Sequence, residues 1–246
     1  FMKIIVILRT AADSASPVRI EQGRIVPDSL RPVLNPFDEV ALAKAVALRT
    51  EDQDREVVAL LSAPPGHETL LHRAFALGAQ RVLHLRTAPE WEPIEQARQL
   101  ASVLRRERPD LILIGREVLG DDRADVGAML SALLDCRFAS AASEVRLTDA
   151  KVVATCETAS GDEDIALTLP AIITAELALA SPRYVTLMEL AAARKKPVER
   201  AESVECSAPT LTSLALHPIA PRQRGVLLGS VAELAAIIRA ELGASS

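Results

Sequence analysis

Lys3–Leu8 has the sequence KIIVIL, and Asp110–Ile114 has the sequence DLILI. Both runs are short, uninterrupted and rich in aliphatic residues, a pattern typical of strands that are buried on both faces of a parallel sheet. Two further runs of this kind lie between them, EVVALL at Glu56–Leu61 and RVLHL at Arg81–Leu85. These four runs predict the central strands of the fold.

Segments with helical patterns separate the four runs. A helix of about four turns should follow residues 35–39 (NPFDE), because Asn is a good N-cap, Pro suits the first helical position and acidic residues favour the positive end of the helix dipole. Glu68–Leu77 is expected to form a helix that stops at Gly78, and Glu92–Glu107 places apolar residues on one helical face. This alternation predicts an α/β fold: an open, mainly parallel, twisted sheet with helices on both faces.

The pattern changes after residue 135. Short strands are expected at Glu144–Leu147, Lys151–Thr155 and Ile165–Thr168, because turn-forming residues separate these runs. Pro170–Glu176 is expected to return to the main sheet as one more strand.

The C-terminal part has a different character. Residues 198–228 show no sustained period and several Pro or Gly breaks, so we expect an extended arm. A capping box formed by Ser230 and Glu233 should open a final helix. We therefore divide the chain into an α/β domain at 1–197 and a C-terminal arm and helix at 198–246.

The composition excludes several classes of protein. The 246 residues are 49% hydrophobic and carry a net charge of −5, which gives no basic surface for nucleic acid. No apolar run reaches the ~18 residues of a membrane span, and no signal-peptide or transit pattern opens the chain. Three cysteines and four histidines form no ligand cluster, so we expect no metal site and a reducing compartment, the cytoplasm.

Two stretches are candidate ligand sites. Residues 35–39 form either a well-capped helix start or a seat whose free N–H groups hold a ribose or phosphate. The loop from Gly115 to Gly127 (GREVLGDDRADVG) leaves the carboxyl end of a buried strand, where open α/β sheets bind ligands. Its glycines would let the backbone approach a ligand closely, although a solvated surface loop is an equal alternative.

A third segment has the properties of a docking surface. Residues 175–197 combine apolar side chains such as Tyr184 and Leu187 with the basic cluster Arg194–Lys196. Core packing and solvated charges are the alternatives to docking. Catalytic motifs are absent: there is no GxSxG elbow, no Cys–His pair and no P-loop, and Mg²⁺-assisted nucleotide hydrolysis at Asp121 and Asp122 is the weakest hypothesis.

Four ordered stretches form a specific combination. They are residues 35–39, residues 76–81 (ALGAQR), the Gly115–Gly127 loop, and residues 169–171 (LPA) with 182–187 (PRYVTL) and 193–197 (ARKKP). On these residues the chain resembles the β subunit of electron transfer flavoprotein over nearly its whole length.

The resemblance implies an adenine-nucleotide-binding type of α/β domain within a heterodimer, in which an α subunit holds a redox-active FAD. The chain would shuttle electrons from acyl-CoA or similar flavin dehydrogenases, in fatty acid or amino acid oxidation, to a quinone oxidoreductase, and would not itself be an enzyme. Its nucleotide site, usually for AMP, would comprise Asn35, Pro36, Phe37, Asp38, Gly115, Arg116, Asp121, Asp122, Arg123, Ala124, Asp125, Val126 and Gly127. Its docking residues would be Pro182, Arg183, Tyr184, Leu187, Met188, Arg194, Lys195 and Lys196, with Leu187 as the anchor.

One departure from the family pattern concerns the nucleotide. Typical members have Asn-Gln-Thr where this chain has Ala124-Asp125-Val126, so phosphate binding should be weaker by about 1–3 kcal/mol per lost charged contact. The pattern also partly resembles the electron-bifurcating branch, in which a second FAD replaces AMP. AMP, a second FAD and an empty site remain open, in that order, and a stand-alone adenine-nucleotide-binding regulatory module is the alternative function.

Overall fold

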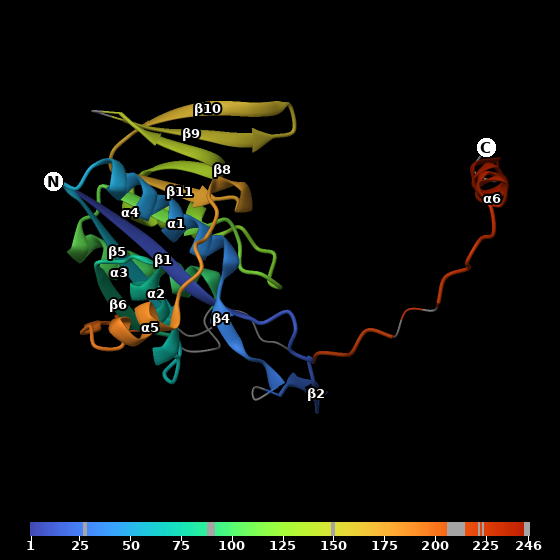
Figure 1. Cartoon of the computed structure of the whole chain (residues 1–246), viewed down its shortest axis with the longest axis horizontal. Helices are drawn as coiled ribbons and strands as arrows, with labels where there is room; N and C mark the ends of the chain where they lie inside the picture. The colour runs from blue at the N-terminus through green and yellow to red at the C-terminus, as the bar shows by residue number, and fades with distance from the viewer. Residues whose placement is uncertain are drawn as a thin grey trace.

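A computed structural model describes residues 1–26, 29–87, 92–148, 151–205, 215–220, 222 and 224–243. An open, twisted sheet of ten strands runs through it in the order β10-β9-β8-β11-β7-β1-β5-β6-β12, with β4 paired to β1 (Figure 1). The neighbours from β8 to β12 are parallel, whereas β9 and β10 form an antiparallel extension at one edge and β4 is antiparallel to β1. The predicted fold class is confirmed.

The elements have the following bounds. The strands of the main sheet are β1 (Met2–Ala12), β4 (Pro32–Leu34), β5 (Arg55–Ala63), β6 (Arg81–Arg86), β7 (Leu111–Gly115), β8 (Arg137–Leu147), β9 (Lys151–Thr158), β10 (Gly161–Thr168), β11 (Ala171–Ala175) and β12 (Glu199–Ala201). A separate hairpin consists of β2 (Ile20–Glu21) and β3 (Arg24–Ile25). The helices are α1 (Pro36–Glu51), α2 (Glu68–Leu77), α3 (Pro93–Glu107), α4 (Val126–Leu134), the short 3₁₀ helix η2 (Leu177–Leu179), α5 (Leu187–Ala193) and α6 (Val231–Gly243).

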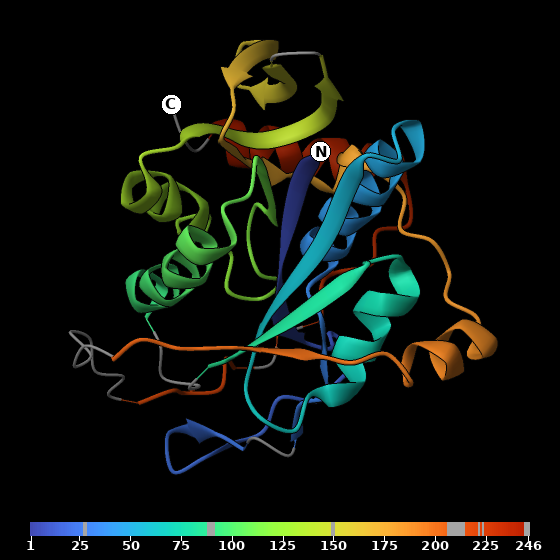
Figure 2. The ribbon, with the colours of Figure 1, turned by 90° about the vertical axis from the view of Figure 1, so that its left-hand side faces the viewer.

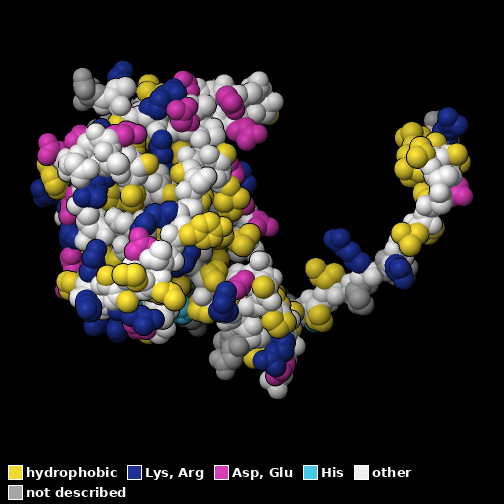
Figure 3. All heavy atoms as spheres, in the orientation of Figure 1, with side chains coloured by type: hydrophobic (Ala, Val, Ile, Leu, Met, Phe, Trp, Pro, Cys, Tyr) yellow, Lys and Arg dark blue, Asp and Glu magenta, His cyan; other side chains and the backbone are white. Residues whose placement is uncertain are grey.

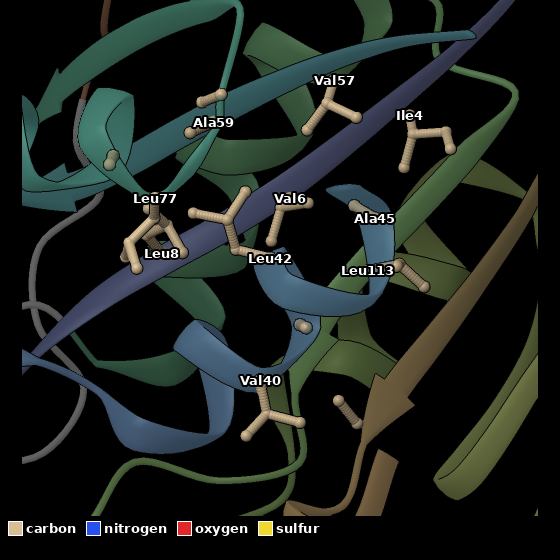
Figure 4. Close-up of a cluster of buried hydrophobic side chains, with 14 of the residues drawn as sticks. Ile4, Val6, Leu8, Val40, Leu42, Ala45, Val57, Ala59, Leu77 and Leu113 are labelled. Carbon is tan, nitrogen blue, oxygen red and sulfur yellow. The ribbon is translucent and has the colours of Figure 1, made fainter. Parts of the chain in front are cut away.

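Alternate side chains of β1 serve two separate cores. Ile4, Val6 and Leu8 pack with residues of α1 and α2 on one face of the sheet, as the close-up in Figure 4 shows for α1. Ile5 and Ile7 pack with residues of α3 and α4 on the other face. Figure 2 shows the green helices α3 and α4 on one side of the sheet and the blue α1 on the other. An uninterrupted apolar strand therefore results from burial on both faces.

The structure extends one predicted strand, confirms another and adds a third that the sequence pattern did not predict. The strand expected at 144–147 begins at Arg137, because the Ala- and Ser-rich segment before it pairs with β11 even though it lacks the usual strand-forming residues. The strand expected at 170–176 is β11, which joins the main sheet between β8 and β7. Residues 199–201, expected in the arm, form β12 and pair with β6.

The last described residues leave this body. Figure 1 shows an extended segment that ends in α6, and Figure 3 shows hydrophobic side chains along it and on the helix. No residue of α6 is buried. Among the described residues, no helix combines the length and apolar character needed to cross a bilayer.

Candidate functional site

The candidate nucleotide site lies where the direction of the chain's crossovers reverses. From β1 the chain passes through α1 to β5 on one side, and later through α3 to β7, which pairs with β1 on its other side. The carboxyl ends of β1 and β7 therefore border the type of crevice in which open α/β sheets bind ligands. Residues 35–39 and the Gly115–Gly127 loop meet at this point.

A buried ion pair lies beneath the junction of these two stretches. Asp38 is fully buried, and its Oδ1 lies 2.8 Å from Nη2 of the buried Arg9. Asp38 Oδ2 also accepts hydrogen bonds from the Arg9 backbone N–H at 2.7 Å and from Arg9 Nε at 3.1 Å. The Gly115 amide donates to Asp38 Oδ1 at 2.7 Å. The carboxylate therefore joins the end of β1, the start of α1 and the end of β7.

Arg9 was not among the sequence-predicted site residues. Its Nη2 also donates to the carbonyl oxygens of Gly115 at 2.7 Å and Glu117 at 3.1 Å, so one guanidinium holds the first turn of the loop. The signal in the sequence is a single charged residue directly after the apolar run Lys3–Leu8. A charge at the carboxyl end of a buried strand needs a partner, and the partner here is Asp38.

Asn35 has a different role from the expected one. It occupies the N-cap position of α1, but its side chain makes no capping hydrogen bond. Asn35 Nδ2 donates to the Glu117 carbonyl at 2.7 Å, and its Oδ1 accepts from the Leu119 amide at 3.1 Å. The residue is fully buried, so its amide closes the loop onto the start of α1.

The glycines at the two ends of the loop lie against other parts of this chain. A Cβ added to Gly115 would lie 2.4 Å from Phe37 Cβ, and one added to Gly127 would lie 2.5 Å from Thr174 Cγ2. Gly120 has open space and a φ of +87°, which favours glycine. Close packing within this chain therefore explains why glycine is needed at positions 115 and 127. A positive φ in the backbone turn explains glycine at position 120.

The outer part of the loop is rich in carboxylates. Arg116 Nη1 lies 2.8 Å from Glu176, and its Nη2 lies 2.9 Å from Glu117; the hydrogen bond that Arg116 donates to Glu117 raises the pKa of Arg116. Arg123 pairs with Asp121 at 2.9 Å, and that hydrogen bond raises the pKa of Arg123. Residues 115–127 contain two arginines and four acidic residues, which disfavours a dianionic phosphate.

The start of α4 offers a different kind of donor. Asp125 is its N-cap residue and makes no side-chain capping hydrogen bond, while Val126 and Gly127 form the buried first turn. Backbone N–H groups at the first turn of a helix can bind an anion without any particular side chain. The first turn of α4 could therefore hold an anion through backbone N–H groups, and the Asp125 carboxylate at the same helix end would oppose it. Asp122 and Ala124 lie exposed between the two ends.

The predicted docking segment presents an exposed apolar tip. Tyr184, Leu187 and Met188 are 96%, 87% and 84% exposed, respectively. Thr186 and Glu189 form a complete capping box at the start of α5, a pattern of the type S/T-x-x-E that the sequence already contains. Leu187 and Met188 therefore lie on a helix start with fixed geometry.

The base of this segment is attached to α2. Arg183 Nη2 donates to the Ala76 carbonyl at 2.5 Å and to Glu189 at 2.8 Å. Lys196 Nζ lies 5.1 Å from the centre of the Phe75 ring, within cation–π range. Pro182, Arg194 and Lys195 are exposed, and Figure 3 shows basic and hydrophobic side chains side by side over α5.

The fold defines a class: an open, twisted α/β domain with a mainly parallel sheet, which here also carries an exposed apolar and basic segment at residues 182–197. Residues 23–205 match the family model described as "Electron transfer flavoprotein domain". The chain is 32% identical to the electron transfer flavoprotein subunit beta of Sus scrofa over 98% of both chains, and 34% identical to that of Homo sapiens over 80% of both. The mitochondrial subunit beta of Oryza sativa subsp. japonica is 32% identical over 95% of this chain and 96% of its own.

The chain belongs to the electron transfer flavoprotein β-subunit family. The resemblance drawn from the sequence is therefore confirmed, and with it an association with flavoprotein electron transfer.

Proposed function

We propose that this chain is the β subunit of a heterodimeric electron transfer flavoprotein and that it carries out no bond chemistry itself. FAD held mainly by the α subunit would take up and release the electrons. The β chain would shape the surroundings of the flavin and position it, since transfer in such a carrier depends on docking geometry. The docking tip carries this proposal, because α5 fixes Leu187 and Met188 in full solvent exposure at its first turn.

Co-expression with an α subunit tests this function. We expect a yellow 1:1 heterodimer with flavin absorbance. A colourless chain of monomeric native mass that binds AMP or ATP without any flavoprotein partner would instead support the regulatory-module alternative.

The electron donor that this surface fits is a flavin dehydrogenase, such as an acyl-CoA dehydrogenase, with an apolar pocket bordered by acidic residues. The apolar tip would enter the pocket, while Arg194 and Lys195 would face the acidic border. A quinone oxidoreductase would accept the electrons. Stopped-flow reduction of the heterodimer by purified dehydrogenases would identify the donor.

The nucleotide that we propose for the crevice is AMP, with a second FAD as the alternative. The site lies where the crossover connections change direction, and this location supports nucleotide binding. The backbone N–H groups of α4 would face the phosphate of the nucleotide. The carboxylates of Asp121 and Asp125 predict weak retention of that phosphate. Denaturing the purified heterodimer and separating the released nucleotides by chromatography would distinguish AMP, FAD and an empty site.

We further propose that the arm and helix at 198–246 pack on the α subunit, and that the protein is cytoplasmic. The exposed apolar side chains of α6 support the first statement, since they have no partner among the described residues of this chain. The unpaired thiols of Cys136 and Cys156 are consistent with a reducing compartment. Cell fractionation tests the location. A mitochondrial location is the alternative, because the name of the rice relative includes the word mitochondrial.

A further inference from the structure

The root of the C-terminal arm, residues 199–205, is attached to the body. Its first three residues form β12, which pairs in parallel with β6. Arg81 Nη2 lies 2.7 Å from Glu199, and Arg106 Nη1 lies 2.9 Å from Glu202, whose carbonyl also accepts from Arg106 Nη2 at 2.6 Å. A strand of only three residues is therefore supported by side chains from β6 and α3.

The most specific of these contacts is made by Gln99 of α3. Gln99 is fully buried, and its Oε1 accepts from the Val204 amide at 2.9 Å while its Nε2 donates to the Val204 carbonyl at 3.0 Å. One carboxamide thus satisfies both backbone groups of a residue 105 positions further along the chain, as a neighbouring strand would. This pair of bonds holds the described chain in place three residues beyond the end of β12.

A second attachment lies further along the arm. The Leu216 amide donates to the Gly23 carbonyl at 2.8 Å, at the turn of the β2–β3 hairpin. Figure 1 shows the arm leaving the body beside this hairpin. Beyond it, α6 exposes hydrophobic side chains that nothing in the described part of the chain covers: Val231, Leu234, Ile237, Ile238 and Leu242.

From these contacts we infer that α3 orients the arm for assembly, with Gln99 and Arg106 as positioning residues for the partner subunit although neither lies on the arm. The inference rests on the proposed function, because the occupant of the apolar arm surface is the flavin-holding α subunit. Family membership and the exposed apolar length of the arm support this occupant. A segment that is held in its bound direction loses less conformational freedom on binding, so loosening its root should weaken association.

The test measures the dissociation constant of the full-length heterodimer by titration calorimetry for matched variants. Gln99→Ala removes both bonds to Val204, together with the 2.7 Å bond from Gln99 Nε2 to Glu95 within α3. Association should weaken about tenfold, the equivalent of two hydrogen bonds of modest net strength. Gln96→Ala is the control on the same helix, because Gln96 bonds to Ser62 within the body at 3.3 Å; its constant should stay within about twofold.

A second pair of variants avoids the core. Arg106→Ala loses the contacts to Glu202, whereas Arg105→Ala loses a bond to the Leu133 carbonyl within the body. Association should weaken only for Arg106→Ala, and Arg106→Lys should restore part of it. Urea unfolding of each isolated β chain distinguishes an effect on arm position from an effect on stability. The inference requires a variant that associates more weakly although its free energy of unfolding is unchanged.

The outcomes separate the two proposals. If the unaltered chains do not associate, the proposed function fails. If they associate and Arg106→Ala binds the α subunit as tightly as Arg105→Ala, the inference about α3 is wrong while the function stands. Self-association of the β chain through α6, with no gain from an α subunit, would contradict the occupant that we assign.

Discussion

The amide of Gly115 donates a 2.7 Å hydrogen bond to the Asp38 carboxylate, which lies 77 residues earlier in the chain. This bond brings the end of β7 against the start of α1, so the two sequence-predicted halves of the nucleotide site become one structural unit. Arg9 of β1 is the third member of this unit. The buried Arg9–Asp38 pair therefore holds in place the loop that should face a ligand.

Asp38→Asn should be among the most destabilising single changes in the chain. It leaves the buried Arg9 guanidinium without a counter-charge, which costs about 3–5 kcal/mol in comparable buried pairs. Urea unfolding followed by circular dichroism measures this. Asp121→Asn, which breaks the exposed pair with Arg123, should cost less than about 1 kcal/mol and is the matched control. Equal costs for the two variants would show that the buried pair does not stabilise the fold.

Gly115→Ala should destabilise the folded protein for a steric reason. The new Cβ would lie 2.4 Å from Phe37 Cβ and 2.5 Å from Asp38 Oδ1, so α1 must shift, at a cost of at least about 1–3 kcal/mol. Gly225→Ala is the control, because its Cβ would have no heavy atom within 4 Å. Thermal unfolding of both variants measures the difference, and a wild-type melting curve for Gly115→Ala would contradict this packing.

Leu187→Ala should slow electron uptake from the dehydrogenase while leaving flavin content and stability unchanged. The side chain is 87% exposed, so its removal leaves no cavity in the body. Loss of a buried apolar anchor at an interface costs about 2 kcal/mol or more, which corresponds to a fall in kcat/KM of at least about tenfold. Val18→Ala, another exposed apolar site, should leave the rate unchanged; the same rate in both variants would remove Leu187 from the docking surface.

Asp125→Asn should strengthen AMP binding by the crevice. A negative charge at the N-cap of α4 repels a phosphate at the same helix end, and its removal is worth about 0.3–1 kcal/mol, or about two- to fivefold in affinity. Asp135→Asn changes the charge at the opposite end of α4 and should have no effect on AMP. Equilibrium dialysis measures both, and a phosphate that does not approach α4 would give unchanged affinity in Asp125→Asn.

The pairing of Arg81 with Glu199 makes β12 sensitive to acid. The hydrogen bond from Arg81 holds the pKa of Glu199 below its usual range. A lowered pKa in the folded state means that this stabilisation is present above the usual value and is lost as the pH falls through the folded one. Both side chains are partly exposed, so the effect should stay within about 1 kcal/mol.

Glu199→Gln provides the measurement for this acid sensitivity. In urea unfolding the free-energy difference between the wild type and the variant should be present at pH 7 and shrink as the pH falls below the usual pKa of a glutamate. A difference that stays constant through the acid range would contradict a contribution from the ionised carboxylate.

The sequence alone established the layers of this protein. The apolar runs at Lys3–Leu8 and Asp110–Ile114 predicted strands covered on both faces, and the helical segments between them supplied that cover. The apolar and basic residues of the docking segment predicted at 175–197 could also be read from the sequence. Such features involve neighbours in the chain, so the sequence pattern contains them.

Only the tertiary structure decided which distant residues form hydrogen bonds with each other. Asn35 has the chemistry of an N-cap, yet its amide bonds to Glu117 and Leu119, because β7 places that loop above α1. Gln99 likewise looks like one more polar residue of a helix until β12 brings Val204 to it. Periodicity records which face of an element is buried, whereas the partner of a buried polar group depends on strand order, which no local pattern specifies.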